Sequence, residues 1–284
     1  MVGKPTILPK FNKPPVVEVL LGVQFEQLAM NVRHLGLLSE LYKTKFPNLQ
    51  NQPTLPHAIE RKGVYSATAP QFLTMTSADQ IPRLWMLNSD ETELLQFQTD
   101  RFMRNWRRYH RDDLPYPSYD GYIRNEFLTD YQTFCKFCLD QGWSEPAVDQ
   151  CEVTYVNHIK HSSVWSEFAQ LGRVSTAWSA DSFAAAGIPA DLIGYRTRHE
   201  LSEADTFLGY LYVQLDSAYA VPPSDVQGSE PVPLIQLQLT ARGRPPAGGL
   251  VGVTRFMDLA HSVIVKSFAD ITTPAMHKLW ERTQ

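Results

Sequence analysis

Two stretches of this chain have nearly the same sequence: residues 94–98 read LLQFQ and residues 234–238 read LIQLQ. Successive side chains of a β-strand point to opposite faces of the sheet. Each stretch therefore places its aliphatic and aromatic side chains on one face and its glutamines on the other. The glutamine rows are Gln96 and Gln98 in the first stretch, and Gln236 and Gln238 in the second. Both stretches predict strands that are apolar on one face only.

Three further predicted strands, at residues 16–27, 148–159 and 207–217, alternate in the same way. Their polar rows include Glu18, Glu152, Tyr210, Tyr212, Gln214 and Asp216. A sheet that is apolar on one face is covered there by helices of the same chain, because this arrangement removes both apolar surfaces from water. We therefore expect an α+β fold with antiparallel strands, helices on one face and an exposed polar face.

The predicted elements follow the same order twice, which indicates two similar β-α-β-β-β-α halves. The first half, residues 14–144, has strands at 16–27, 63–69, 83–88 and 93–107 and helices at 35–46 and 119–141. The second half, residues 145–284, has strands at 148–159, 194–201, 207–217 and 233–242 and helices at 163–171 and 253–268. Thr273 and Pro274 predict one more short helix. Residues 1–13 are expected to form a flexible lead-in, residues 221–230 a hairpin loop, and the two halves one compact unit.

The composition is that of an ordinary globular protein: 284 residues, 43% of them hydrophobic, with a formal net charge of −4. An acidic chain offers nucleic acid and anionic lipid no long-range attraction. The three cysteines, Cys135, Cys138 and Cys151, are an odd number in a long chain, which is typical of reduced thiols. The first residues lack the apolar core of a signal peptide, and no stretch reaches the length of a membrane-spanning helix. These features predict a cytoplasmic protein without membrane contact.

Three segments resemble a sporadically distributed family of uncharacterised bacterial and archaeal proteins. They are the opening PPVVEV at 14–19, the central FQTDRF at 97–102 with NWR at 105–107 and YPSY at 116–119, and the closing 261–268 with 272–280. The central motif includes Arg101, Asn105, Trp106 and Arg107. The resemblance implies one full-length unit of prokaryotic origin, and it implies no activity, cofactor or catalytic residue.

Residues 101–111, RFMRNWRRYHR, carry five arginines with Phe102, Trp106 and Tyr109 among them. Arginine and aromatic side chains together can neutralise phosphates and stack on bases. The alternative, which we favour, is that Trp106 packs in a core while the arginines pair with neighbouring carboxylates. Arg101 in particular is expected to find a carboxylate partner, and Glu18 is the candidate, because an unpaired charge in an apolar strand is costly.

Motifs of established chemistry are missing from the sequence. The spacing of Cys135 and Cys138 fits a redox motif, but both lie late in an amphipathic helix, where ordinary buried thiols are expected. His158 and His161 near Cys151 lack the second close ligand pair of a zinc site. Hydrolase and nucleotide-binding motifs are not found, so we predict neither a metal nor another cofactor.

We interpret the chain as a non-enzymatic interaction protein whose binding surface is the polar sheet face. The predicted binding residues are Glu18, Gln96, Gln98, Asp100, Tyr210, Tyr212, Gln214, Gln236 and Gln238. A protein partner or a second copy suits such a surface, and a small uncharged ligand is an alternative. An enzyme is the second hypothesis, which requires at least two of Glu18, Asp100, Glu152 and Asp216 to meet in a concavity. Nucleic-acid binding through residues 101–111 is the third.

Overall fold

The computed structural model describes residues 7–64, 81–108, 111–178, 187–188, 190–220 and 232–284. These residues form one antiparallel sheet of nine strands in the order β2-β3-β4-β5-β1-β6-β9-β8-β7. The strands are β1 (Val16–Phe25), β2 (Asn48–Gln52), β3 (Arg83–Leu87), β4 (Glu93–Gln98), β5 (Arg101–Arg107), β6 (Val148–Lys160), β7 (Gly194–Glu203), β8 (Thr206–Ala220) and β9 (Val232–Gly243). The predicted α+β class is confirmed.

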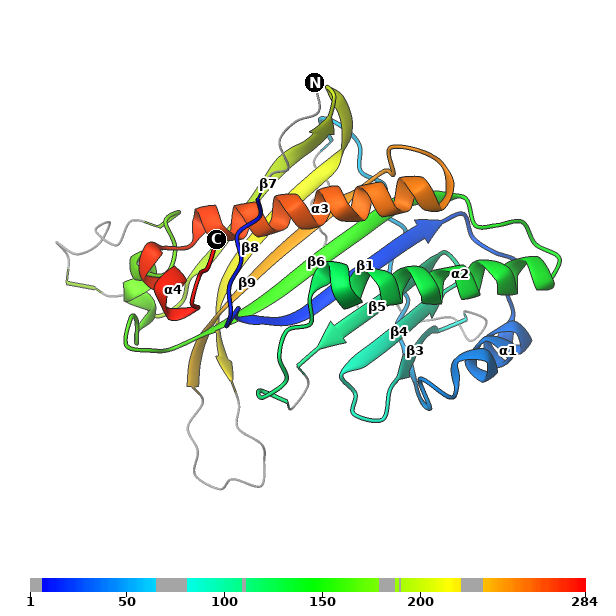
Figure 1. Cartoon of the computed structure of the whole chain (residues 1–284), viewed down its shortest axis with the longest axis horizontal. Helices are drawn as coiled ribbons and strands as arrows, with labels where there is room; N and C mark the ends of the chain where they lie inside the picture. The colour runs from blue at the N-terminus through cyan, green and yellow to red at the C-terminus, as the bar shows by residue number, and fades with distance from the viewer. Residues whose placement is uncertain (1–6, 65–80, 109–110, 179–186, 189, 221–231) are drawn as a thin grey trace.

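Two long helices, α2 (Arg124–Asp140) and α3 (Gly249–Ile271), lie across the same face of this sheet (Figure 1). The shorter helical segments are α1 (Val32–Tyr42), the single π-helical turn η1 (Tyr119–Ile123) that leads into α2, the 3₁₀ segment η2 (Phe168–Arg173), and α4 (Pro274–Leu279). Thr273 caps α4 by accepting a hydrogen bond from the Met276 N–H, as its position before Pro274 predicts. Within the described residues, no helix is long and apolar enough to cross a bilayer.

The apolar rows of the strands are buried beneath these helices. Phe97 of β4 and Phe102 of β5 pack against Phe134 of α2, with ring centroids 5.6 and 5.4 Å from that of Phe134. Helix α3 packs over β6 and β9 and buries residues at helical spacing, which are Val253, Phe256, Met257, Ala260 and Ile264. The strand alternation therefore predicted correctly which face becomes the core.

The two halves meet where β1 pairs with β6 at the centre of the sheet. From this seam outward the order is β1-β5-β4-β3 in the first half and β6-β9-β8-β7 in the second. In both halves the last strand along the chain pairs with the first. This order agrees with the expected duplication, although a common origin of the halves stays a prediction.

Some predicted elements differ from the structure. Residues 93–107 form two strands, because Thr99 and Asp100 make a two-residue turn between β4 and β5. Strand β2 was not predicted, since its sequence NLQNQ is polar and its residues are exposed or half-buried at the sheet edge. The helix expected at 163–171 is replaced by η2. Of the strand expected at 63–69, Gly63 and Val64 form a turn and coil, and the rest lies outside the described residues, as does the loop at 221–230.

Residues 11–13, at the end of the expected flexible lead-in, contact the C-terminal part of the chain. The Asn12 and Lys13 N–H groups donate to the carbonyls of Glu281 and Trp280, 3.1 Å away in each case. The Phe11 ring packs edge-on against Trp280, with 6.1 Å between centroids. The beginning and end of the described chain are thereby joined.

Candidate functional site: a strapped polar face

The sheet face opposite α2 and α3, here called the polar face, carries the glutamine and tyrosine rows. Strand register places Gln24 of β1 beside Arg101 of β5 and Gln150 of β6. It likewise places Gln214 of β8 beside Gln238 of β9. The polar side chains therefore form continuous rows across both halves, as the strand alternation predicted.

Residues 53–64, here called the strap, cross this polar face from one side of the sheet to the other. Their contacts follow the strand order: Arg83 of β3, Gln98 of β4, Arg101 of β5, Gln24 of β1, Gln150 of β6, Arg242 of β9, Tyr210 and Tyr212 of β8, and Arg198 of β7. Eight strands spaced 4.8 Å apart span about 34 Å. The eleven steps from residue 53 to residue 64 span about 36–40 Å when fully extended. The strap therefore runs across the strands with most of its length extended, and its last residues form a turn in which the Val64 N–H donates to the Arg61 carbonyl at 3.2 Å.

The chain does not need to cross the polar face in order to connect β2 with β3, the strands that precede and follow the strap in the sequence. Gln52 at the end of β2 is paired with Arg83 at the start of β3, so a two-residue turn could have closed this hairpin. Residues 53–82 are inserted there instead. Insertions of this length in a compact domain commonly serve a function.

Two glutamines of the sheet bind the main chain of the strap. Gln98 accepts from the Leu55 N–H at 2.8 Å and donates to the Leu55 carbonyl at 2.9 Å. Gln24 accepts from the Ala58 N–H at 3.0 Å and donates to the Ala58 carbonyl at 2.8 Å. A side-chain amide that engages both polar groups of one residue resembles a strand partner, and the contact does not depend on that residue's side chain.

Further main-chain contacts extend this pattern along the strap. Arg101 donates to the Pro56 carbonyl at 2.8 Å, and Gln150 accepts from the Glu60 N–H at 3.3 Å. The Tyr210 hydroxyl accepts from the Gly63 N–H at 3.1 Å. The strap is thus held through its main chain on both sides of the central seam.

The strap side chain of His57 lies between two carboxylates. Its Nδ1 is 2.9 Å from Oδ2 of Asp100, and its Nε2 is 3.1 Å from Oδ2 of Asp149. Burial alone would raise the pKa of Asp100, but hydrogen bonds and charge attraction from Arg101 and His57 outweigh it and hold that pKa below its ordinary value. Asp100 therefore stays ionised beneath the strap at neutral pH.

The strap side chain of Glu60 is a carboxylate, and it lies beside a hydroxyl donor and an arginine, whereas His57 lies between two carboxylates. Its Oε2 accepts from the Tyr212 hydroxyl at 2.9 Å, and its Oε1 is 3.7 Å from an Arg242 nitrogen. Burial, followed by the Glu60 carboxylate, raises the pKa of Tyr212 to about 12, so this phenol keeps its proton and donates. Arg242 also binds Glu152, at 2.6 Å from Nε to Oε2.

The expectation of an exposed polar face is therefore correct only in part. The strap buries Gln98, Asp100 and Tyr210, and Gln96 is buried against Trp85, Arg83 and Asn105. Five of the predicted binding residues remain half-buried: Glu18, Tyr212, Gln214, Gln236 and Gln238. Alternation decides which face a side chain points to, but it carries no information on what lies above it.

The expected pairing of Glu18 with Arg101 is wrong, although Arg101 does bind a carboxylate. Register places Gln24 opposite Arg101, whereas Glu18 lies opposite Arg107. Arg101 instead pairs with Asp100, 3.1 Å from Nε to Oδ1. Glu18 accepts from the Asn105 amide, and burial raises its pKa.

The other arginines of residues 101–111 pair mainly with acids or stack on rings. Arg104 is buried and contacts Glu93 and Asp130, each at 2.8 Å. Arg107 is near Glu91, Arg111 pairs with Asp113, and Arg108 lies over the ring of Trp106. Trp106 itself is buried in the core. Tyr109 lies outside the described residues. The favoured alternative of carboxylate pairing thus describes Arg101, Arg104, Arg107 and Arg111.

The four acids of the enzyme hypothesis take different partners in the described part of the chain. Glu18 binds Asn105, Asp100 binds Arg101 and His57, Glu152 binds Arg242, and Asp216 accepts from Gln214 at 2.5 Å. Asp100 shares a partner with a carboxylate outside this set, because His57 bridges Asp100 and Asp149. Within the described residues, none of these partners is shared between two of the four acids named from the sequence.

The three cysteines are buried and unpaired, as expected of ordinary core thiols. Burial raises the pKa of Cys135 to about 11 and that of Cys138 to about 12. Both therefore remain protonated at neutral pH, which opposes a redox role. Among the described residues, no group of three or more metal-ligating side chains comes together.

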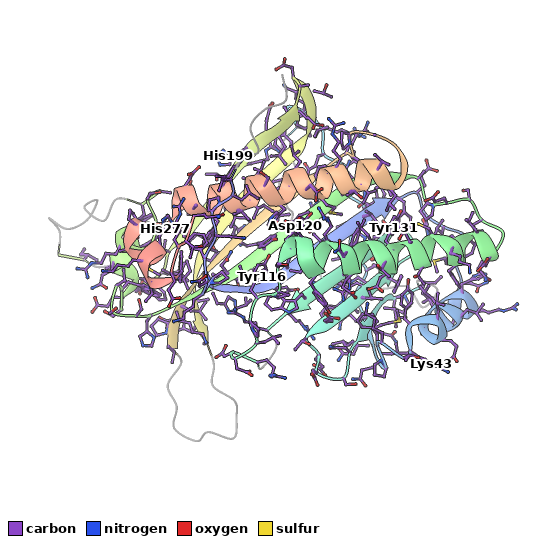
Figure 2. All side chains as sticks on the ribbon, in the orientation of Figure 1. Lys43, Tyr116, Asp120, Tyr131, His199 and His277 are labelled. Atoms are coloured by element: carbon purple, nitrogen blue, oxygen red, sulfur yellow. The ribbon has the colours of Figure 1, made fainter. Side chains whose placement is uncertain are left out.

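A second polar cluster lies on the helix side of the sheet, where η1 and the start of α2 approach α3; Figure 2 labels Asp120 in this region. The Tyr155 hydroxyl of β6 is 2.8 Å from Nδ1 of His261 and 3.1 Å from the Tyr116 hydroxyl. The Tyr119 ring stacks on His261 with 3.8 Å between centroids. Burial lowers the pKa of His261 to about 4, more than Asp120 and Asp258 raise it. His261 is therefore neutral at pH 7 and shares a hydrogen bond with the Tyr155 hydroxyl.

The strap and several of its partners were not identified from the sequence. Gln24 and Gln150 already lay in the predicted polar rows, which was the one usable signal for them. The sequence contained no comparable signal for His57, Asp149 and Arg242, because their roles depend on contacts between segments that are distant in the chain. The chain matches no protein-family model and no curated protein sequence.

Proposed function

We propose that this protein is a non-enzymatic interaction protein whose polar face binds an extended polypeptide laid across the strands. The observation that carries the proposal is the pair of glutamine contacts, Gln98 on Leu55 and Gln24 on Ala58. These side chains bind main-chain atoms that every polypeptide has. On this proposal the strap is an intramolecular occupant of a site for partner segments.

The burial pattern of residues 53–64 supports the proposal that the strap can detach from the polar face. None of residues 53–64 is buried, so the strap adds no fully buried apolar side chain to the core. The groups beneath it, Gln24, Gln98, Arg101 and Gln150, are polar and can be hydrated after it leaves. Segments with little buried apolar surface open at low free-energy cost.

A second copy of the chain is the other source of such a segment, because its strap has the same sequence. In that case two copies would exchange straps, which is a low-cost route to a dimer. A dimer whose fraction rises with protein concentration, and which is lost when Gln24 and Gln98 are replaced, would identify this form.

Panning a library of displayed twelve-residue peptides on the full-length protein tests the proposal. We expect enrichment on the chain carrying His57→Ala and Glu60→Ala, which weaken the strap's own contacts, and on the same chain with Gln50→Ala, an exposed glutamine of β2 that lies outside the strap contacts. Enrichment should be lost when Gln24→Ala and Gln98→Ala are added to that chain. Equal enrichment on all three chains, or none on any, contradicts the proposal.

We further propose that the two halves arose by duplication and that the protein works in a prokaryotic cytoplasm. The strand order from the central seam supports the first statement. The three unpaired cysteines and the family resemblance support the second.

A further inference from the structure

Beneath the strap, the polar face has two charge-selective positions of opposite sign. At the first, carboxylate oxygens of Asp100 and Asp149 face the two ring nitrogens of His57 at 2.9 and 3.1 Å. A neutral imidazole has only one N–H, whereas an imidazolium donates from both nitrogens. This position therefore fits a cation, which would lie beside the Arg101 that already pairs with Asp100, or a neutral imidazole whose Nε2 accepts from the Gln24 amide 3.1 Å away.

At the second position the sheet presents donors. The Tyr212 hydroxyl donates to one oxygen of Glu60, and Arg242 lies near the other. The Glu60 N–H is itself bound by Gln150. A carboxylate is the side chain that satisfies both donors at once.

The distance along the chain between these positions is fixed by the main-chain contacts. Ala58, which follows His57, is bound at both its N–H and its carbonyl by Gln24. Three residues of extended chain, from 57 to 60, cover about 10 Å. A segment bound in this register must place its cation over β5 and β1 and its carboxylate over β9 and β8.

We infer that the polar face selects an extended partner segment with a cationic or imidazole side chain followed, three residues later, by a carboxylate. This inference rests on the proposed function and names the partner's chemistry. Asp100, Asp149, Tyr212 and Arg242 determine the selection, and Gln24 and Gln98 hold the main chain. His57 and Glu60 of the strap satisfy the same pattern within the chain.

The strap competes with any partner, because a tethered segment acts at an effective concentration in the millimolar range. The test therefore uses the full-length chain with His57→Ala and Glu60→Ala, which leaves every sheet residue in place. A chain with Glu60→Ala alone is the milder alternative if the double variant loses cooperative unfolding. The probe is a fluorescein-labelled peptide of residues 53–64, PTLPHAIERKGV.

Fluorescence anisotropy compares this peptide with versions carrying His57→Glu, Glu60→Lys or His57→Lys. We expect each inverted charge to weaken binding at least about ten-fold, as losing a charge-assisted hydrogen bond does, and His57→Lys to stay within about three-fold of the parent. The net charge of −4 would by itself attract the Glu60→Lys peptide more strongly, so its weaker binding is a specific signal. The protein with His57→Ala and Glu60→Ala is here called the loosened chain. Adding Asp149→Asn to it should reduce the loss of affinity caused by His57→Glu in the peptide. The loss caused by Glu60→Lys in the peptide should be unchanged.

The outcomes separate the two proposals. Equal binding of all four peptides, abolished by Gln24→Ala with Gln98→Ala, overturns the charge selection and leaves main-chain binding standing. If the folded, loosened chain binds none of the peptides, both proposals are refuted. Unchanged penalties in the Asp149→Asn chain contradict the role assigned to that carboxylate.

Discussion

The half-buried His261 of α3, which contacts Tyr155 of β6, should make the protein sensitive to mild acid. His261 stacks on Tyr119 and shares a hydrogen bond with Tyr155, and burial lowers its pKa to about 4. In the unfolded chain an ordinary histidine titrates near 6.5. Because the folded pKa is the lower one, the contribution of His261 to stability is complete above pH 6.5 and is lost as the pH falls toward 4.

The size of the effect follows from the difference in pKa. A difference of two and a half units corresponds to about 3 kcal/mol of unfolding free energy, most of it lost by about pH 4.5. Denaturant unfolding at several pH values between 7.5 and 4.5, monitored by tryptophan fluorescence, measures this loss.

The comparison that isolates His261 is its replacement by glutamine, which does not titrate and can still share a hydrogen bond with Tyr155. We expect the unfolding free energy of the native chain to fall by about 2–3 kcal/mol more than that of His261→Gln over this pH range. His161→Gln, at an exposed position, is the control and should follow the native curve. Parallel curves for the native chain and His261→Gln would refute the reasoning.

Two further predictions concern the buried ion pairs and the strap. Arg104→Met leaves the Glu93 and Asp130 carboxylates without their buried partner and should cost about 3–5 kcal/mol in denaturant unfolding. The exposed Arg111→Met should cost at most about 1 kcal/mol, and similar losses for both variants would be inconsistent with the buried network. In native-state hydrogen exchange, Gln24→Ala should speed exchange of the Ala58 amide roughly five-fold, the effect of about 1 kcal/mol. The Leu55 amide, which Gln98 binds, should be little affected, and a uniform change at both amides would contradict separate main-chain contacts.

The sequence contained one signal that the strand prediction overlooked. The residues facing the helices are odd-numbered in β4, where they are Leu95 and Phe97, and even-numbered in β5, where they are Phe102 and Trp106. A change of phase within one apparent strand indicates an inserted turn, and here it marks Thr99 and Asp100. Strand β2 had no comparable signal, because an exposed edge strand with a polar sequence has no apolar alternation.

The sequence by itself determined the fold class, the type of most elements and the face to which the residues of the predicted alternating strands point. These properties depend on periodicity within short segments, where the alternation of apolar and polar side chains is a local consequence of strand geometry. Tertiary structure alone decided that the strap covers the polar face and that Gln98, Asp100 and Tyr210 are buried. The strap has no apolar periodicity, and its main-chain hydrogen bonds join residues far apart in the chain, such as Gln24 with Ala58. Contacts of this kind form only when the whole sheet has brought their partners together.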